Sequence, residues 1–191
     1  MNDGKKKSLG RPRSDKSHQA ILQAALELLG EVGFDGISIE AISSRAGVGK
    51  TTIYRRYSGK GELIADAIES MREEVLIPDT GNLTSDIDKL IENAAQISLN
   101  PLGRQTVSMI ISSASSNLEF AQIYWKKYLQ PRRAAFDIVI QRAKSRNEVS
   151  QDLDSGLVFD TMSGIMLYAM IFPPTTESWE AYVRRALRLI F

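Results

Sequence analysis

The chain has 191 residues, of which 43% are hydrophobic and 25% are charged, values that are typical of a globular protein. It has no cysteine, which excludes disulfide bonds, thiolate metal sites and cysteine nucleophiles, and its single histidine, His18, leaves hydrolytic triads and histidine metal sites without their central residue. The net charge is +1, but the charges are unevenly distributed along the chain. Residues 1–60 carry eleven Lys/Arg and six Asp/Glu, whereas residues 61–191 carry thirteen Lys/Arg and seventeen Asp/Glu. A basic N-terminal third on an acidic body suggests a nucleic-acid-binding module joined to a domain with another role.

Membrane insertion and export are not indicated by the sequence. Residues 1–13 are polar and basic and lack the apolar segment of a secretory signal. The most apolar stretch, residues 157–172, contains Asp160 and is shorter than the roughly 20 apolar residues that cross a bilayer. We therefore expect a soluble cytoplasmic protein without membrane contact. Since no grouping of residues points to catalysis, we also expect no enzymatic activity, no cofactor and no metal.

In chain order, the first predicted element is a disordered basic arm, residues 1–14, in which Lys and Arg stand among Gly, Pro and Ser. Arg11 and Arg13 of such an arm can lie along phosphates or enter the minor groove of DNA, although the arm can equally be a solubilising tail. A helix then begins at Asp15, carries apolar residues at the 3.6-residue period of an amphipathic helix, and ends at Gly33.

Residues 37–64, ISIEAISSRAGVGKTTIYRRYSGKGELI, have the pattern of two short helices joined by a glycine turn. Gly47 is free to take the positive φ that such a turn requires. The second helix carries cationic, hydroxyl and phenolic side chains, and no acid lies between positions 41 and 61. This surface is typical of one that binds a polyanion, so we predict a helix-turn-helix DNA-binding domain over residues 15–61. An ordinary basic surface helix is the alternative.

The same segment contains GVGKTT, residues 47–52, which resembles part of a phosphate-binding P-loop. A P-loop needs a glycine at position 44, where Ser44 stands, and a buried strand leading into it, whereas the preceding residues have helical periodicity. No hydrophobic run that ends in an Asp follows to hold magnesium. A nucleotide-binding switch is therefore kept only as a remote alternative.

Beyond residue 61 the pattern stays helical, with no convincing strand. A linker is predicted at residues 78–81, and Pro131 is expected to kink or split the long helix that contains it. The predicted helices cover about residues 62–77, 85–99, 102–115, 119–146, 154–172 and 177–190. The sequence thus predicts an all-α protein of about nine helices, with a helical regulatory and dimerisation domain over residues 62–191.

The last two predicted helices carry more apolar surface than one internal face of a small protein can cover. One interpretation is a central core helix with a covering partner. The other, which we favour, is a two-helix dimer interface that symmetry doubles into a four-helix bundle, because paired helix-turn-helix modules usually read two half-sites. The residues predicted for this interface are Leu157, Met162, Ile165, Tyr168, Trp179, Tyr182, Val183, Ala186, Leu187 and Ile190.

Residues 17–64 also carry a series of short motifs in a fixed order. They are Gly33-Phe34, Ser38-Ile39, Ala46-Gly47-Val48, Thr52-Ile53-Tyr54, Tyr57, Lys60 and Leu63. With these motifs the chain resembles the tetracycline-repressor (TetR) family of bacterial transcriptional regulators, in which GRPRS (residues 10–14) also recurs. Three further motifs resemble a common TetR-type C-terminal regulatory domain: NPLGRQ (residues 100–105), PRRAAF (131–136) and DLD (152–154).

The resemblance implies a homodimer whose two modules bind an inverted-repeat operator in the major groove of double-stranded DNA. It also implies a repressor that a small-molecule effector releases; a TetR-like regulator without a ligand, controlled by a partner or constitutive, is the alternative. By position, Lys50, Thr51 and Arg55 would reach base edges. The residues implied to contact phosphates are Ser38, Thr52, Tyr54, Arg56, Tyr57 and Lys60, besides Arg11 and Arg13 of the arm. Two of these, Arg56 and Tyr57, depart from the family's usual Tyr or His and Phe, and Tyr57 is alternatively part of the core.

The effector pocket is expected among apolar and aromatic residues of the regulatory domain, and core packing is the alternative for each of them. Such a lining favours a largely apolar or aromatic effector, and flexible methionines tolerate variety in its shape. The candidate pocket residues are Met71, Met109, Ile110, Ser113, Trp125, Tyr128, Phe136, Phe159, Met162 and Met166. The resemblance further implies a bacterial protein that is associated with the nucleoid when it is bound to DNA.

Overall fold

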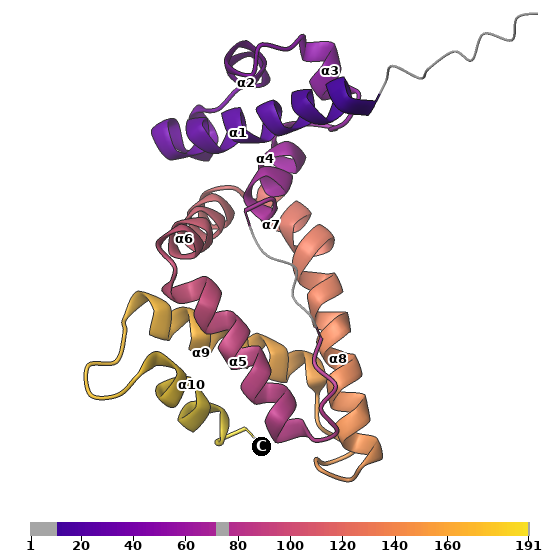
Figure 1. The fold of residues 1–191 in the computed structure, drawn as a ribbon, viewed down its shortest axis with the longest axis vertical. Helices are drawn as coiled ribbons and strands as arrows, with labels where there is room; N and C mark the ends of the chain where they lie inside the picture. The colour runs from indigo at the N-terminus through magenta and orange to yellow at the C-terminus, as the bar shows by residue number, and fades with distance from the viewer. Residues whose placement is uncertain (1–10, 72–76, 191) are drawn as a thin grey trace, which may run out of the picture. The chain divides into compact units, whose positions relative to one another are not determined.

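The computed structural model describes residues 11–71 and 77–190 (Figure 1). Its regular elements are helices, and these described residues contain no strand, in agreement with the predicted all-α class. They divide into two compact units. The first unit holds the described residues up to Ser70 together with Met109–Ile123, and the second holds the described residues from Met71 to Ser108 and from Tyr124 onward.

The first unit begins with four helices and is completed by the second half of α6 and most of α7. The four are α1 (Arg11–Gly36), α2 (Ile39–Arg45), α3 (Lys50–Tyr54) and α4 (Lys60–Glu69). Their short connections follow from the glycines that the sequence places between them. α4 ends earlier than the predicted helix over residues 62–77, of which residues 72–76 lie outside the described part of the chain.

α1 begins at Arg11, so Arg11 and Arg13 lie in a helix and the prediction of a disordered arm is wrong for residues 11–14. Residues 1–10 of the predicted arm lie outside the described residues. Pro12 is compatible with this start, because the N–H that proline lacks would have no intrahelical partner in the first turn. At the other end Gly33 has a φ of 67°, which interrupts the helix where the sequence predicts its end.

The core of the first unit forms where α4 and α2 pack against α1. Its fully buried aliphatic side chains are Ile21, Ile42, Ile53, Leu63, Ile64 and Ile68. Phe34 meets Phe120 of α7 edge to face, with ring centroids 5.0 Å apart. The predicted domain division after residue 61 falls inside α4, whose apolar side is buried against α1, and for this reason α4 lies in the first unit.

Three helices of the second unit have starts that are capped by polar side chains. The Asn82, Asp154 and Ser178 side chains accept hydrogen bonds from backbone N–H groups of α5, α9 and α10. The helices that follow α4 in the chain, of which α6 and α7 belong partly to the first unit, are α5 (Leu83–Leu99), α6 (Pro101–Ser116), α7 (Leu118–Tyr124), α8 (Gln130–Ser145), α9 (Ser155–Ile171) and α10 (Trp179–Leu187). No helix among the described residues is both long and apolar enough to cross a bilayer.

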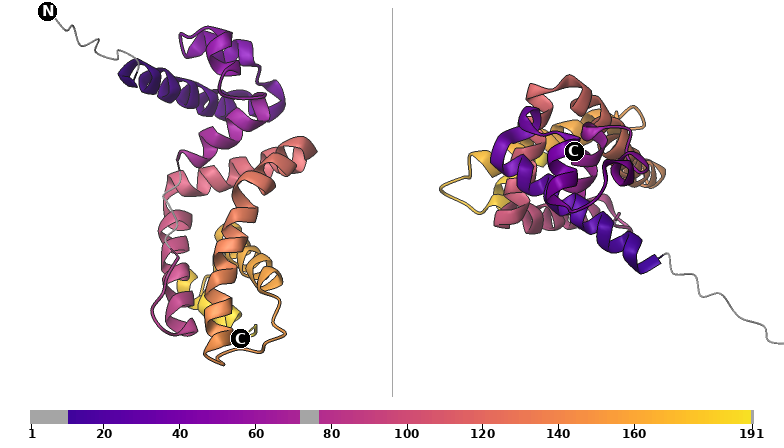
Figure 2. Two further views of the ribbon diagram at one scale, coloured as in Figure 1. Left: turned by 90° about the vertical axis from the view of Figure 1, so that its right-hand side faces the viewer. Right: turned by 90° about the horizontal axis from the view of Figure 1, so that it is seen from above.

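α9 lies against α8 and α10, and α5 contacts all three of them (Figures 1 and 2). Four residues predicted as dimer contacts, Met162, Trp179, Val183 and Leu187, are buried in the core between these helices. The dimer prediction is therefore wrong for these four, because α5 and α8 already cover them within the protomer. Phe136, predicted for the effector pocket, is buried in the same core.

The α-helix predicted around Pro131 is divided directly before this proline, as the sequence predicts. A π-helical segment (Trp125–Leu129) separates α7 from α8. In a regular α-helix the proline ring would clash with the carbonyl four residues earlier. Directly before Pro131 the backbone instead makes a wider turn, in which the N–H of Gln130 donates to the carbonyl of Trp125. With this stretch taken as one helix, the described residues contain nine helices, the number that the sequence predicts.

Candidate nucleic-acid interface

α2 and α3 form the predicted helix-turn-helix, and three small residues determine its shape. The Oγ atom of Ser38 accepts a hydrogen bond from the N–H of Ala41 at 3.1 Å and so caps α2. Ser43 is buried, and its carbonyl accepts a bond from the N–H of Val48 at 3.0 Å, which closes the turn. Gly47 has a φ of 64°, a conformation that L side chains rarely adopt. The sequence pattern and the backbone geometry thus agree.

α3 presents an exposed row of polar side chains, while Ile53 on its other side is fully buried. This row consists of Lys50, Thr51, Tyr54 and Arg55. It therefore brings together the three predicted base-contacting residues and one predicted phosphate contact. Of the other predicted phosphate contacts, Ser38 is exposed at the start of α2, and Thr52 and Arg56 are half-buried beside the row.

Lys50 is bound to a carboxylate that no motif of the sequence points to. Its Nζ atom donates to Oε1 of Glu40, which lies in the first turn of α2. The hydrogen bond from Lys50 lowers the pKa of the Glu40 carboxyl below its usual value. The two residues are ten positions apart, a spacing that has no meaning on a single helix, so only the crossing of α2 and α3 brings them together.

Tyr57 is a core residue, so its prediction as a phosphate contact is wrong. Its side chain is only 4% exposed, and its hydroxyl lies 3.5 Å from Nδ1 of His18. Burial, followed by the nearby Asp66 carboxylate, raises the pKa of Tyr57 to about 12. The alternative of a core role is thus the correct one. The signal in the sequence was that this position resembles one where the TetR family usually has Phe, an apolar residue.

Lys60 was predicted to contact a phosphate, but its ammonium group is used inside the first unit. Nζ donates to the carbonyls of Phe34 at 3.1 Å, Ile37 at 3.2 Å and Asp35 at 3.5 Å. It also lies 4.9 Å from the centroid of the Phe34 ring. An ammonium has three donors, as many as the carbonyls that lie within hydrogen-bond distance here. In this arrangement Lys60 joins the start of α4 to the turn between α1 and α2.

A second link that the sequence did not reveal joins α2 to α1. The guanidinium of Arg45 donates to both carboxylate oxygens of Glu31, at 2.6 and 2.8 Å, and lies 3.9 Å from Glu27. Two parallel bonds of this kind restrict geometry as well as adding energy. The Arg45 hydrogen bond lowers the pKa of Glu31. This link orients α2, and with it the turn that leads into α3.

The P-loop alternative does not fit the local structure. GVGKTT begins in the turn after α2 and continues into α3, so a helix and not a strand leads into it. A phosphate-binding loop of that type needs the strand in order to aim its backbone N–H groups at the nucleotide. The described residues offer no such arrangement around Gly47.

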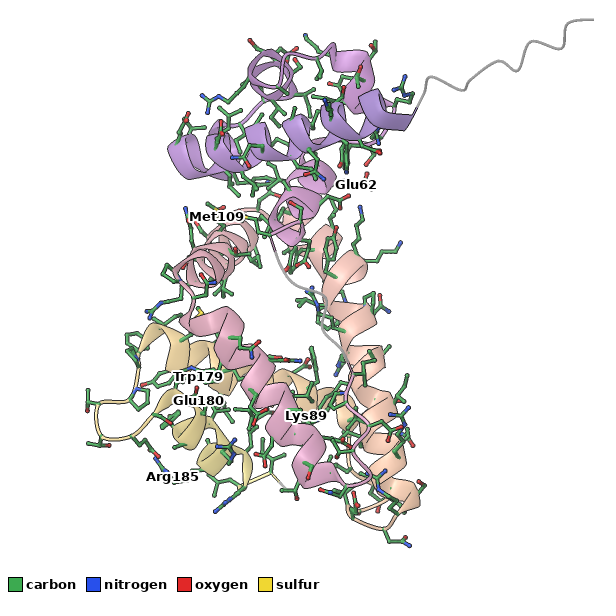
Figure 3. The ribbon with its side chains drawn as sticks, in the orientation of Figure 1. Glu62, Lys89, Met109, Trp179, Glu180 and Arg185 are labelled. Atoms are coloured by element: carbon green, nitrogen blue, oxygen red, sulfur yellow. The ribbon has the colours of Figure 1, made fainter. Side chains whose placement is uncertain are left out.

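The ten predicted pocket residues do not all lie in one compact unit. Met109, Ile110 and Ser113 belong to the first unit, and Ser113 is buried there. The other seven belong to the second unit, where Phe136 and Phe159 are in tilted contact with ring centroids 5.7 Å apart. Figure 3 labels Met109 on α6 and Trp179 at the start of α10. For Phe136 and Met162, which are buried in the core, the alternative of core packing is the one that the structure supports.

Comparison with known protein families identifies the family to which this chain belongs. Residues 21–67 match the family of bacterial regulatory proteins named tetR, and residues 77–190 match the tetracyclin repressor-like C-terminal domain. The chain belongs to the TetR family. The resemblance seen in the sequence is thereby confirmed for both parts of the chain.

Individual TetR-family relatives cover most of the chain. The HTH-type transcriptional regulator YdeS of Bacillus subtilis (strain 168) is 32% identical over 176 residues, which are 92% of this chain and 88% of YdeS. The DNA-binding transcriptional repressor TetR of Mycobacteroides abscessus is 30% identical over 165 residues, which are 83% and 84% of the two chains. The solved structure of the transcriptional regulator FadR from Bacillus subtilis in complex with stearoyl-CoA has a TM-score of 0.65 at 19% identity and covers 91% of this chain and 97% of that one.

These comparisons agree with the geometry of α2 and α3. The protein is a TetR-family DNA-binding transcriptional regulator with the all-α fold of that family. The two relatives named above are likewise transcription regulators.

Proposed function

We propose that this regulator is a homodimeric repressor whose two helix-turn-helix modules bind the half-sites of an inverted repeat and that a small, largely apolar effector releases it. The exposed row on α3 carries the proposal of DNA contact. Its Lys50 and Arg55 side chains have the donors that guanine O6 and N7 accept, and the methyl group of Thr51 can meet a thymine methyl. Tyr54 and the capping residue Ser38 would add hydroxyl contacts to phosphates.

Selection of binding sites from random duplex DNA tests this role. The wild-type protein is expected to enrich an inverted repeat, and Arg55→Ala is expected to bind it about 5- to 150-fold more weakly with relaxed preference at one position of each half-site. Arg188→Ala, an exposed arginine after α10, is the matched control for the loss of one positive charge. Unchanged affinity and base preference in Arg55→Ala and in alanine variants of Lys50 and Thr51 would show that α3 does not contact the bases.

Dimerisation is supported by an exposed stripe on α9. Leu157 and Tyr168 are 62% and 58% exposed, and Thr161 and Gly164 lie between them at helical spacing on the same exposed side. A Cβ atom added at Gly164 would meet nothing within 4 Å, so the protomer leaves this small residue open for the close approach of another helix. Such a stripe is what one half of an isologous helix interface needs. In the proposed interface this exposed stripe takes the place of Met162, Trp179, Val183 and Leu187, which the sequence predicts as dimer contacts and which are buried in the protomer.

Sedimentation velocity of a Gly164→Arg variant tests the interface. The protomer has room for the new side chain, so we expect a folded protein whose dissociation constant for dimerisation is raised by at least about tenfold, since a charge would be buried between helices. Gln141→Arg, on the exposed side of α8, is the matched control and is expected to remain dimeric. A wild-type protein that sediments as a monomer at micromolar concentration would refute the proposal.

An apolar effector is supported by the aromatic and methionine residues of the second unit and by the similarity of fold to FadR, which was solved with stearoyl-CoA. If effector binding is coupled to DNA release with about 1–3 kcal/mol, saturating ligand lowers operator affinity by about 5- to 150-fold. Titrating the operator complex with a panel of long-chain and aromatic compounds, read by fluorescence anisotropy, tests this. If none of the compounds releases the DNA, the regulator without a ligand is the better description.

A further inference from the structure

The pair formed by Glu40 and Lys50 lies at the edge of the proposed DNA-binding surface. Glu40 is in the first turn of α2 and Lys50 is the first residue of α3, so both residues lie at the N-terminal ends of their helices. Their side chains are 63% and 50% exposed, and the Nζ atom of Lys50 donates to Oε1 of Glu40. An acid is therefore attached to the first residue of the exposed row on α3.

Stability of the fold does not explain this pair. An ion pair between exposed side chains gains little, because water screens the charges and both side chains lose freedom. The Arg45 and Glu31 pair already links α2 to its neighbouring helix with two bonds. The Glu40 and Lys50 pair is therefore better explained by what the surface binds than by what holds the surface together.

A carboxylate on a surface that approaches DNA is repelled by the phosphates unless it meets a hydrogen-bond donor. In the major groove the groups that can donate to a carboxylate are on base edges, and Glu is suited to accept from the N4 amino group of cytosine. A lysine is suited to O6 and N7 of guanine. In a G·C base pair these groups lie side by side, as the carboxylate of Glu40 and the ammonium of Lys50 do here.

We propose that Glu40 and Lys50 together read one G·C base pair in each half-site, with Lys50 donating to guanine and Glu40 accepting from the paired cytosine. An ammonium has three donors, so Lys50 can keep its bond to Glu40 while it contacts the guanine. The bond between the two side chains restricts Lys50 before DNA arrives, which reduces the entropy lost on binding. This inference rests on the proposed DNA-binding role of α3 and adds to it the identity of one base pair.

Site selection with three variants tests the inference. Glu40→Gln removes the carboxylate charge, Lys50→Met removes the ammonium and keeps the length of the side chain, and Glu119→Gln is a matched control on the exposed side of α7. The wild type and the control are expected to prefer G·C at one shared position by about tenfold or more over other pairs. Both Glu40→Gln and Lys50→Met are expected to lose most of that preference at the same position and to keep the others.

Three results would overturn the inference. If Glu40→Gln leaves every positional preference intact and tightens binding to all sequences alike, Glu40 only screens the charge of Lys50. Preferences lost at two different base pairs would show that the residues read separately. A wild-type protein that enriches an inverted repeat without this G·C preference would reject the inference alone, whereas one that enriches no sequence would reject the proposed function with it.

Discussion

Replacing Lys60 by methionine separates a role inside the protein from a role on DNA. Methionine keeps most of the aliphatic stem but removes the ammonium group, so the carbonyls of Phe34, Asp35 and Ile37 lose their donor. If the three bonds stabilise the turn between α1 and α2, the variant is less stable and its remaining DNA contacts are unchanged. If Lys60 binds a phosphate instead, stability is kept and the salt dependence of DNA binding falls.

The expected loss follows from the geometry of the three bonds. A hydrogen bond to a charged group contributes about 1.5–3 kcal/mol when it is well shielded, and we take about 1 kcal/mol for each of the two part-buried bonds, to Phe34 and Ile37. The exposed bond to Asp35 adds little, because water replaces the ammonium there. The contact with the Phe34 ring adds about 0.5–1 kcal/mol. The total, about 2–3 kcal/mol, lowers Tm by about 4–12 °C in a chain of this length.

Thermal unfolding followed by circular dichroism measures this loss, with Lys89→Met as the control for one exposed lysine on α5 (Figure 3). The operator affinity of the Lys60 variant is then measured between low and high salt. A phosphate contact contributes about 0.9 to the slope of log K against log salt concentration for duplex DNA. An unchanged Tm together with a slope reduced by that amount per protomer would refute the internal role of Lys60.

Three further outcomes are expected. Because the pKa of Tyr57 rises to about 12 in the folded protein, from about 10 in an unfolded chain, its contribution to stability is complete below pH 10 and is lost as pH rises towards 12. Urea titrations across about pH 9–11.5 should therefore show that the free energy of unfolding falls more steeply with pH in the wild type than in Tyr57→Phe. Gly47→Ala should cost about 1–2 kcal/mol, because an L residue is strained at a φ of 64°, whereas Gly59→Ala, at an extended φ of −174°, should not show this loss in the same denaturation assay. Phe120→Ala should cost about 3–5 kcal/mol by calorimetry, since this fully buried ring packs edge to face on Phe34; a loss below 1 kcal/mol would contradict its place in the core of the first unit.

Local patterns in the sequence were sufficient to predict the helix-turn-helix. The glycine at position 47 acts within a few residues, so its effect on the backbone can be read without the rest of the chain. The roles of Glu40 and Lys60 could not be read in this way. Each depends on groups ten or more positions away, and in the case of Lys60 these are backbone carbonyls, which every residue has.

The exposed residues of the proposed dimer interface were only partly predictable for a different reason. α9 is apolar on nearly every side, so no periodic pattern distinguishes the side that faces α8 and α10 from the side that stays exposed. Packing makes that choice: Val158 and Met162 are buried, whereas Leu157 and Tyr168 are left exposed. The sequence therefore could not indicate which face of α9 stays exposed.

The three backbone carbonyls around the ammonium group of Lys60 have a consequence for substitutions that preserve charge. An ammonium is nearly spherical and can direct three hydrogens to acceptors on one side, whereas the donors of a guanidinium lie in one plane as a fixed fork. Arginine at position 60 could reach at most part of the set formed by Phe34, Asp35 and Ile37, and its bulkier head would have to fit beside the Phe34 ring. An exchange that is usually regarded as conservative would therefore behave at this position like the loss of a structural bond.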